Sequence, residues 1–299
     1  MIFLDGVGIG KKDARQNPFF AVEMKTLRTV LDGHIPHLHG ARCDLPAVSL
    51  TPVNATLGVP GLPQSGTGQT ALFTGFNAPR FIGKHFGPYP YSTLKPIIRE
   101  RNIFRKLIER DKQVFYANAF PRQFFQYIYS NSKKNRTTAS TMSWLSTDLA
   151  LNDYTALAAG KAVSSDITNE RWHALGYPDL GVIVPQEAGV RLAGLTRKYD
   201  FVLFEYFFTD HAGHSQSIAQ AAEVLTKLDW LLEGVLSAFD HDSMLLILTS
   251  DHGNLEDLST KTHTRNPVPL LAVGSGHRTI AQKVKNLTHI APAILEIMT

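Results

Sequence analysis

The sequence predicts an α/β fold, a three-layer sandwich with a mainly parallel central sheet and an inserted cap region. Short apolar segments typical of buried strands recur along the chain, and helical patterns lie between several of them. The regular pattern then loosens between about residues 79 and 195. Strands that alternate with helices favour a parallel sheet that is covered on both faces.

The apolar runs have the length of buried strands. They cover residues 2–4, 113–117, 181–184, 201–207, 244–248 and 270–273. The clearest helix is predicted at residues 217–239, where apolar residues recur at helical spacing on one stripe. Such a stripe packs on a sheet.

The segment at 79–195 contains Pro-Tyr-Pro at 88–90, a polar run at 130–136 and many aromatic residues. We expect a single core that spans residues 1–299, with part of this segment inserted as a cap.

Composition excludes several classes of protein. With 43% hydrophobic and 19% charged residues, the chain is globular in character, and no apolar run reaches the ~20 residues of a membrane span. The net charge is +4, but the only basic cluster, Lys133, Lys134 and Arg136, is short, so we expect neither a nucleic-acid nor a membrane partner. One cysteine and no signal-peptide pattern favour a cytoplasmic location. The oligomeric state stays open.

Acidic residues and histidines follow three of the predicted strands. Asp5 ends the first, Asp210 and His214 follow the strand at 201–207, and Asp251 and His252 follow the strand at 244–248. Because ligands of open α/β sheets bind at the carboxyl ends of the strands, these side chains should converge. Converging carboxylates are costly without cations, so the pattern predicts a metal site.

Each motif alone has another interpretation. Asp-His-Gly-Asn at 251–254 is also typical of a turn, and a lone His263 is usually a hydrogen-bonded histidine. Together, at strand ends, they favour a metal. Carboxylates and imidazoles without a thiolate suit Zn²⁺ or Mn²⁺, and the choice between these two stays open.

Residues 61–75 are rich in glycine and predict a tight loop that leads into a helix. Ser65 would begin this helix, where free N–H groups and the helix dipole favour a phosphate group. It is either an ordinary capping serine or a nucleophile, and a nucleophile would need a metal or a base beside it. The glycines at 6, 8 and 10 do not form a dinucleotide fingerprint, because Lys11 occupies the third glycine position.

These motifs resemble, in the same order, those of the alkaline phosphatase superfamily of metalloenzymes. Within it they are similar to the branch of cofactor-independent phosphoglycerate mutase and phosphopentomutase. The matching segments are Phe3-Leu4-Asp5-Gly6, Ser65-Gly66-Thr67-Gly68-Gln69, Asp210 to His214, Asp251-His252-Gly253-Asn254, and His263 to Pro269. In related phosphodiesterases and sulfatases the nucleophile lies nine residues before a Thr-Gly, as Ser65 does, which favours it over Thr67 or Thr70.

The resemblance implies a two-metal phosphoryl-transfer enzyme that acts on a small phosphorylated metabolite. The implied ligand sets are Asp210, His214 and His263 for one divalent ion, and Asp5, Asp251, His252 and the Ser65 oxygen for the other. Attack by Ser65 would give a phosphoserine, which water resolves in a phosphatase and a substrate hydroxyl resolves in a mutase.

Two features depart from the mutases. Gln69 replaces their histidine, and the chain has no room for the large transferase domain of phosphoglycerate mutase. A phosphodiesterase or sulfatase-like hydrolase is the alternative enzyme, although Thr67 and Gln69 occupy the Pro and Arg positions of the sulfatase maturation pattern. A non-catalytic, metal-stabilised binding protein on the same fold is the alternative of another class.

We expect the cap to supply contacts to the substrate, because phosphate favours guanidinium and ammonium groups. The candidates for this role are Arg80, Lys84, His85, Arg136 and Arg171.

Overall fold

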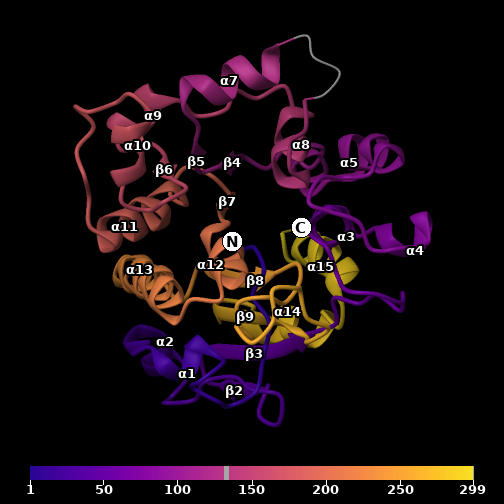
Figure 1. Cartoon of the computed structure of the whole chain (residues 1–299). Helices are drawn as coiled ribbons and strands as arrows, with labels where there is room; N and C mark the ends of the chain where they lie inside the picture. Colours follow the sequence, from indigo (N-terminus) through magenta and orange to yellow (C-terminus); the bar gives the residue numbers. More distant parts are fainter. Residues whose placement is uncertain (131–134, 299) are drawn as a thin grey trace.

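The computed structural model describes residues 1–130 and 135–298, so Lys133 and Lys134 of the basic cluster lie outside the described part. A seven-stranded sheet in the order β2-β3-β9-β8-β1-β7-β4 forms the centre of the molecule (Figure 1). Its strands are β1 (Ile2–Leu4), β2 (Cys43–Leu45), β3 (Val48–Val53), β4 (Val114–Tyr116), β7 (Phe201–Tyr206), β8 (Leu245–Ser250) and β9 (Val268–Gly274).

Five of these strands run in one direction. β8, β1, β7 and β4 pair in parallel, and β3 shares their direction because the antiparallel β9 lies between β3 and β8. The α/β sandwich with a mainly parallel sheet is thus confirmed.

Alternate side chains of the sheet enter two apolar cores, one on each face. On β7, Phe201 and Leu203 enter the first core, whereas Val202 and Phe204 enter the second. The first core is covered by α3 (Ser65–Thr74), α4 (Ala78–Ile82), η1 (Ser92–Leu94), α5 (Lys95–Arg101), α6 (Ile103–Ile108), α8 (Ala139–Leu145), α14 (His277–Lys283), η2 (Leu287–His289) and α15 (Ile290–Ile297). The second is covered by α1 (Pro18–Ala21), α2 (Lys25–Val30), α11 (Pro185–Leu195), α12 (Phe208–Ser215) and α13 (Ile218–Ser237).

The long helix expected at 217–239 is confirmed as α13. Ser217 caps it by accepting a hydrogen bond from the Gln220 N–H at 3.3 Å, and its apolar stripe is buried against the sheet and α11.

The prediction of a strand at 181–184 is wrong. This stretch has no strand conformation and leads into α11, which begins at Pro185. Val182 and Val184 are 53% and 61% exposed, so the run is apolar without being buried.

A smaller unit lies above the carboxyl ends of the central strands. It contains β5 (Asn118–Ala119), β6 (Val163–Ser164), α7 (Arg122–Tyr129), α9 (Tyr154–Ala158) and α10 (Glu170–Ala174), with the helices at the top and upper left of Figure 1. Its own core is a small cluster that includes Leu157 and Trp172. The rest of the segment at 79–195 joins the sandwich, since β4 extends the sheet while α5, α6, α8 and α11 cover its faces. None of the helices in the described residues is both long and apolar enough to span a bilayer.

Candidate metal centre

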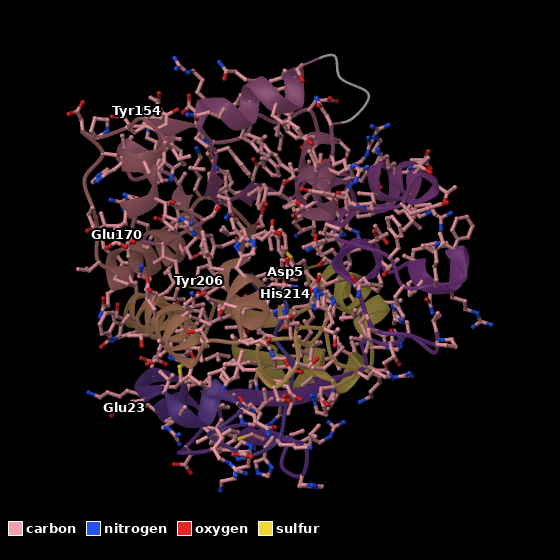
Figure 2. All side chains as sticks on the ribbon, viewed as in Figure 1. Asp5, Glu23, Tyr154, Glu170, Tyr206 and His214 are labelled. Carbon is pink, nitrogen blue, oxygen red and sulfur yellow. The ribbon has the colours of Figure 1, made fainter. Side chains whose placement is uncertain are left out.

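The acidic residues predicted to converge do meet at the carboxyl edge of the sheet. Asp5 follows β1, Asp210 lies in the first turn of α12 after β7, and Asp251 follows β8. Figure 2 places Asp5 and His214 near the centre of the molecule. Gly6, with φ of 68°, permits this approach, because a Cβ there would lie 2.4 Å from Asp210 Oδ1.

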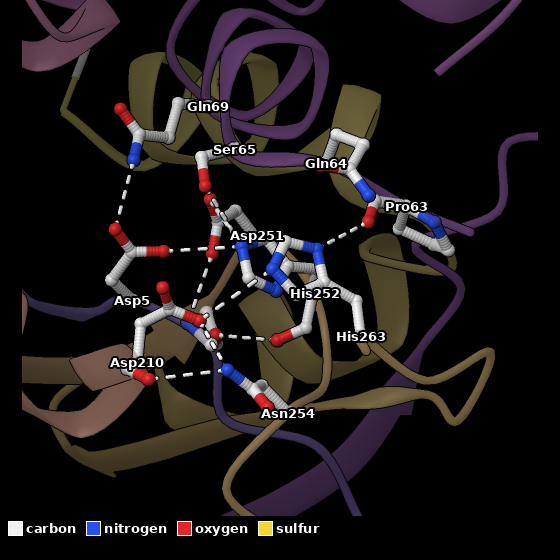
Figure 3. Close-up of polar contacts among 12 residues, drawn as sticks. Asp5, Pro63, Gln64, Ser65, Gln69, Asp210, Asp251, His252, Asn254 and His263 are labelled. Atoms are coloured by element: carbon white, nitrogen blue, oxygen red, sulfur yellow. Dashed lines mark hydrogen bonds and ion pairs between the residues drawn. The ribbon is translucent and has the colours of Figure 1, made fainter. Parts of the chain in front are cut away.

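The first group of potential ligands consists of Asp210, His214 and His263, whose ligand atoms all lie within 4.8 Å of one another. His214 Nε2 is 3.3 Å from both Asp210 Oδ2 and His263 Nε2. His214 Nδ1 donates to the Lys261 carbonyl at 2.9 Å. His263 Nδ1 donates to the Pro63 carbonyl at 2.8 Å (Figure 3). Because these carbonyls fix the proton on Nδ1, both Nε2 atoms are free to ligate a metal.

The second group consists of Asp5, Asp210 and His252, so Asp210 belongs to both groups. His252 Nε2 lies 3.2 Å from Asp5 Oδ1 and 3.6 Å from Asp251 Oδ2. Asp251 therefore lies next to the second group. The third member of that group, with Asp5 and His252, is Asp210 and not Asp251.

Unpartnered oxygens show that a cation suits this cluster. Asp5 Oδ1 and Asp251 Oδ2 are buried without a hydrogen bond, and both share His252 Nε2 as an ion-pair partner, at 3.2 Å and 3.6 Å. A buried carboxylate oxygen without a donor is strongly unfavourable, and a divalent ion between these residues removes that cost.

The pKa values have the same electrostatic origin. Burial lowers the pKa of His252, but the facing carboxylates of Asp251 and Asp5 outweigh burial and raise it to about 10. Burial, followed by the charge of Asp5, raises the pKa of Asp251 above its usual range. Burial and the charge of His252 lower the pKa of His263 to about 4, which keeps that imidazole neutral and able to ligate. The proton on His252 offsets part of the carboxylate charge here, and bound cations would take over that task.

Ser65 is the first residue of α3 and is 6% exposed. Its Oγ lies 3.0 Å from His252 Nε2. The neighbouring hydroxyls are engaged elsewhere, since Thr67 Oγ1 donates to the Gln64 carbonyl and Thr70 Oγ1 donates to the Gly66 carbonyl. Ser65 is thus the hydroxyl of this segment that faces the predicted ligands.

Several supporting residues were not predicted from the sequence. Asn254 Nδ2 donates to Asp210 Oδ1 at 2.6 Å, and Gln69 Nε2 donates to Asp5 Oδ2 at 3.5 Å. Glu256, which is 1% exposed, accepts hydrogen bonds from the N–H groups of Gly8 and Asn254, both at 2.8 Å. It ties the loop after Asp5 to the loop after Asp251. Asn254 belongs to the recognised Asp-His-Gly-Asn motif, whereas nothing in the sequence distinguished Glu256.

The five expected substrate contacts divide into two sets. Arg136 and Arg171 line a cavity of about 450 Å³ that also has Asp5 in its wall. Arg80 is exposed on α4, Lys84 lies over the rings of Phe86 and Tyr91, and His85 bonds to the Val59 carbonyl. Those three do not line that cavity.

The fold is of the alkaline phosphatase-like class. Residues 189–299 match the family model described as Metalloenzyme superfamily. This match covers the carboxyl-terminal part of the chain.

Curated relatives include 2,3-bisphosphoglycerate-independent phosphoglycerate mutases. The one from Ehrlichia canis is 31% identical over 109 residues, which are 34% of this chain and 22% of that protein. The one from Legionella pneumophila is 24% identical over 259 residues, which are 77% of this chain and 48% of that protein. The chain thus spans less than half of these relatives.

Solved structures with a similar fold include alkaline phosphatases. The enzyme from the Antarctic bacterium TAB5 has a TM-score of 0.54 at 13% identity, and the alignment covers 99% of this chain and 97% of that one. The Thermus thermophilus enzyme has a TM-score of 0.52 at 12% identity, with 98% and 90% covered. At such identities the similarity concerns the fold alone.

Proposed function

We propose that the chain is a two-metal phosphoryl-transfer enzyme, a phosphomonoesterase or phosphomutase that acts on a small phosphorylated metabolite through a phosphoserine at Ser65. One observation carries the proposal: Ser65 Oγ, at the amino end of α3, lies 3.0 Å from a histidine of the carboxylate–imidazole cluster.

The residues present fit two divalent ions, Zn²⁺ or Mn²⁺. The first would be held by Asp210, His214 and His263, and the second by Asp5, Asp251, His252 and Ser65. Ions bound there would lower the pKa of the Ser65 hydroxyl and stabilise charge on the phosphoryl oxygens.

In the proposed reaction, Ser65 Oγ attacks phosphorus, the bond to the leaving alcohol breaks, and the phosphoryl group stays on Ser65. The amino end of α3 favours the charge of that group. Water then attacks and releases phosphate, or a substrate hydroxyl attacks and receives the phosphoryl group. Asn254 holds Asp210 in place through its 2.6 Å hydrogen bond. From the cap, Arg136 and Arg171 are the cations best placed to contact substrate, because they line the cavity at Asp5.

The test is a panel of phosphomonoesters, phosphodiesters and sulfate esters, assayed with Mn²⁺ or Zn²⁺ and accompanied by analysis of bound metal. We expect bound metal and a preference for phosphomonoesters. A preference for diesters or sulfate esters would support the hydrolase alternatives, and bound metal without any turnover would support a binding protein.

A further inference from the structure

The cavity of about 450 Å³ beside Asp5 has a size typical of small-molecule sites. It extends from the strand ends to the smaller unit around β5 and β6. Much of its wall is aromatic, with contributions from Phe120, Phe124, Trp172 and Phe208. Such walls suit a ring or another compact apolar body.

One buried acid in this cavity has an unused oxygen. Glu205 lines the cavity and is 4% exposed. Its Oε2 accepts hydrogen bonds from Tyr116 Oη at 2.5 Å and from Ser140 Oγ at 2.6 Å. Its Oε1 is buried without a hydrogen-bond partner. Because both hydrogen bonds from the protein are made to Oε2, the carboxylate is held in one orientation and Oε1 stays available as an acceptor.

Glu205 is close to the proposed reaction in the fold. On β7 it pairs in register with Phe3 of β1, two residues before Asp5. Asp5 and Glu205 line the same cavity, so a substrate whose phosphoryl group lies at Ser65 and Asp5 has room for its remaining part along the wall that contains Glu205. A buried acceptor without a hydrogen bond lowers the stability of a complex. A ligand that donates a hydrogen bond to Oε1 removes this penalty, and a ligand without a donor does not.

We propose that this cavity binds the non-phosphoryl part of the substrate and that Glu205 is a specificity-determining residue, whose Oε1 accepts a hydrogen bond from a hydroxyl or amino group there. The inference rests on the proposed function, because the cavity meets that site at Asp5. The substrate class is then a phosphomonoester of a compact, partly apolar alcohol that carries a second hydrogen-bond donor.

The test uses benzylphosphonate and its three hydroxyl and three methoxy ring isomers, titrated calorimetrically into the metal-loaded protein. Burial raises the pKa of Glu205 to about 7, so titrations at pH 8 keep the carboxylate ionised and acceptor-only. We expect at least one hydroxyl isomer to bind roughly tenfold to a hundredfold more tightly than benzylphosphonate, with no such gain for its methoxy counterpart.

Glu205→Gln supplies the matched variant. If its amide oxygen takes the donors of Tyr116 and Ser140, its amide N–H₂ faces the cavity and now donates. The preference for hydroxyl over methoxy should therefore fall by roughly tenfold or more. Glu100→Gln, an exposed change on α5, should leave it unchanged. Thermal unfolding checks that both variants fold.

An equal affinity for hydroxyl and methoxy isomers in the wild type, or an unchanged preference in Glu205→Gln, would overturn the inference. Turnover of phenyl phosphate, measured in parallel, reports on the proposed function separately. If phosphomonoesters are turned over but the preference for hydroxyl over methoxy isomers does not depend on Glu205, only the cavity inference is wrong. If that preference is found but no phosphomonoester is turned over, the proposed function is wrong.

Discussion

Replacing Asp251 by asparagine should destabilise the metal-loaded protein more than the metal-free protein. In the absence of metal, Asp251 is a fully buried carboxylate beside Asp5, with an oxygen that accepts no hydrogen bond. Its pKa is raised by burial and by the charge of Asp5, so its ionised form is unfavourable in the fold. Asp251→Asn removes that burial cost but also removes a carboxylate that faces the His252 imidazolium, so the stability of the metal-free protein should change little.

With metal, the loss of a ligand adds a destabilising effect. An ion present at a hundred times its dissociation constant stabilises the folded state by about 2.7 kcal/mol, and each tenfold loss of affinity removes about 1.4 kcal/mol of that. For a chain of 299 residues, with about 2.1 cal/mol/K of unfolding entropy per residue, 1 kcal/mol corresponds to roughly 1.6 °C in Tm. Loss of a ligand that weakens binding a hundredfold should therefore abolish most of a metal-dependent Tm rise of about 4 °C.

The assay is thermal unfolding of both proteins in Mn²⁺ or Zn²⁺ and in a chelator, with bound metal counted in parallel. Asp242→Asn, an exposed change in the loop before β8, is the control and should retain the full metal-dependent rise. An equal rise in Asp251→Asn and wild type, with equal bound metal, would refute the assignment of Asp251 to the metal centre.

Three further predictions concern individual contacts. Asn254→Ala should weaken metal binding roughly tenfold to a hundredfold, as measured by metal titration, because Asp210 Oδ1 loses its 2.6 Å hydrogen bond; unchanged affinity would remove Asn254 from the site. Thr67→Ala should lower kcat by less than roughly tenfold in steady-state assays, because its hydroxyl bonds to backbone groups, and a loss as large as that of Ser65→Ala would argue against this. Burial raises the Glu205 pKa from 4.5 to about 7, so the folded state holds this proton more tightly than the unfolded state between those pH values. The wild type should thus lose stability relative to Glu205→Gln as pH rises from 4.5 to 7, and parallel urea midpoints for the two proteins across that range would contradict this.

The sequence predicted those parts of the fold in which burial and apolar character coincide. β7 and β8 each have a neighbouring strand on both sides and are mostly apolar, so both were recognised. β3 was missed because Ser49, Thr51 and Pro52 interrupt its apolar pattern. The run at 181–184 misled for the opposite reason, since it is apolar but exposed.

The site followed from topology more than from side-chain detail. Strand ends were enough to predict that Asp5, Asp210 and His252 would converge, because parallel strands place their carboxyl ends together. That Asp210 belongs to both ligand groups depends on side-chain orientation, which no spacing specifies. Glu205 gave a weak signal, as an acid within the apolar run of β7, but its role depends on Tyr116 and Ser140 from elsewhere in the chain.

The central claim is that Ser65 is the nucleophile, and trapping the covalent intermediate tests it most directly. Metal-loaded protein is mixed with a phosphomonoester that it turns over, quenched in acid, digested and analysed by mass spectrometry. We predict one added phosphate on the peptide that contains Ser65, localised to that residue by fragmentation. In Ser65→Ala, the phosphopeptide should be absent and kcat lower by several orders of magnitude, with the fold and most of the bound metal retained. Phosphate on Thr67 or Thr70, or an active Ser65→Ala protein, would contradict the account.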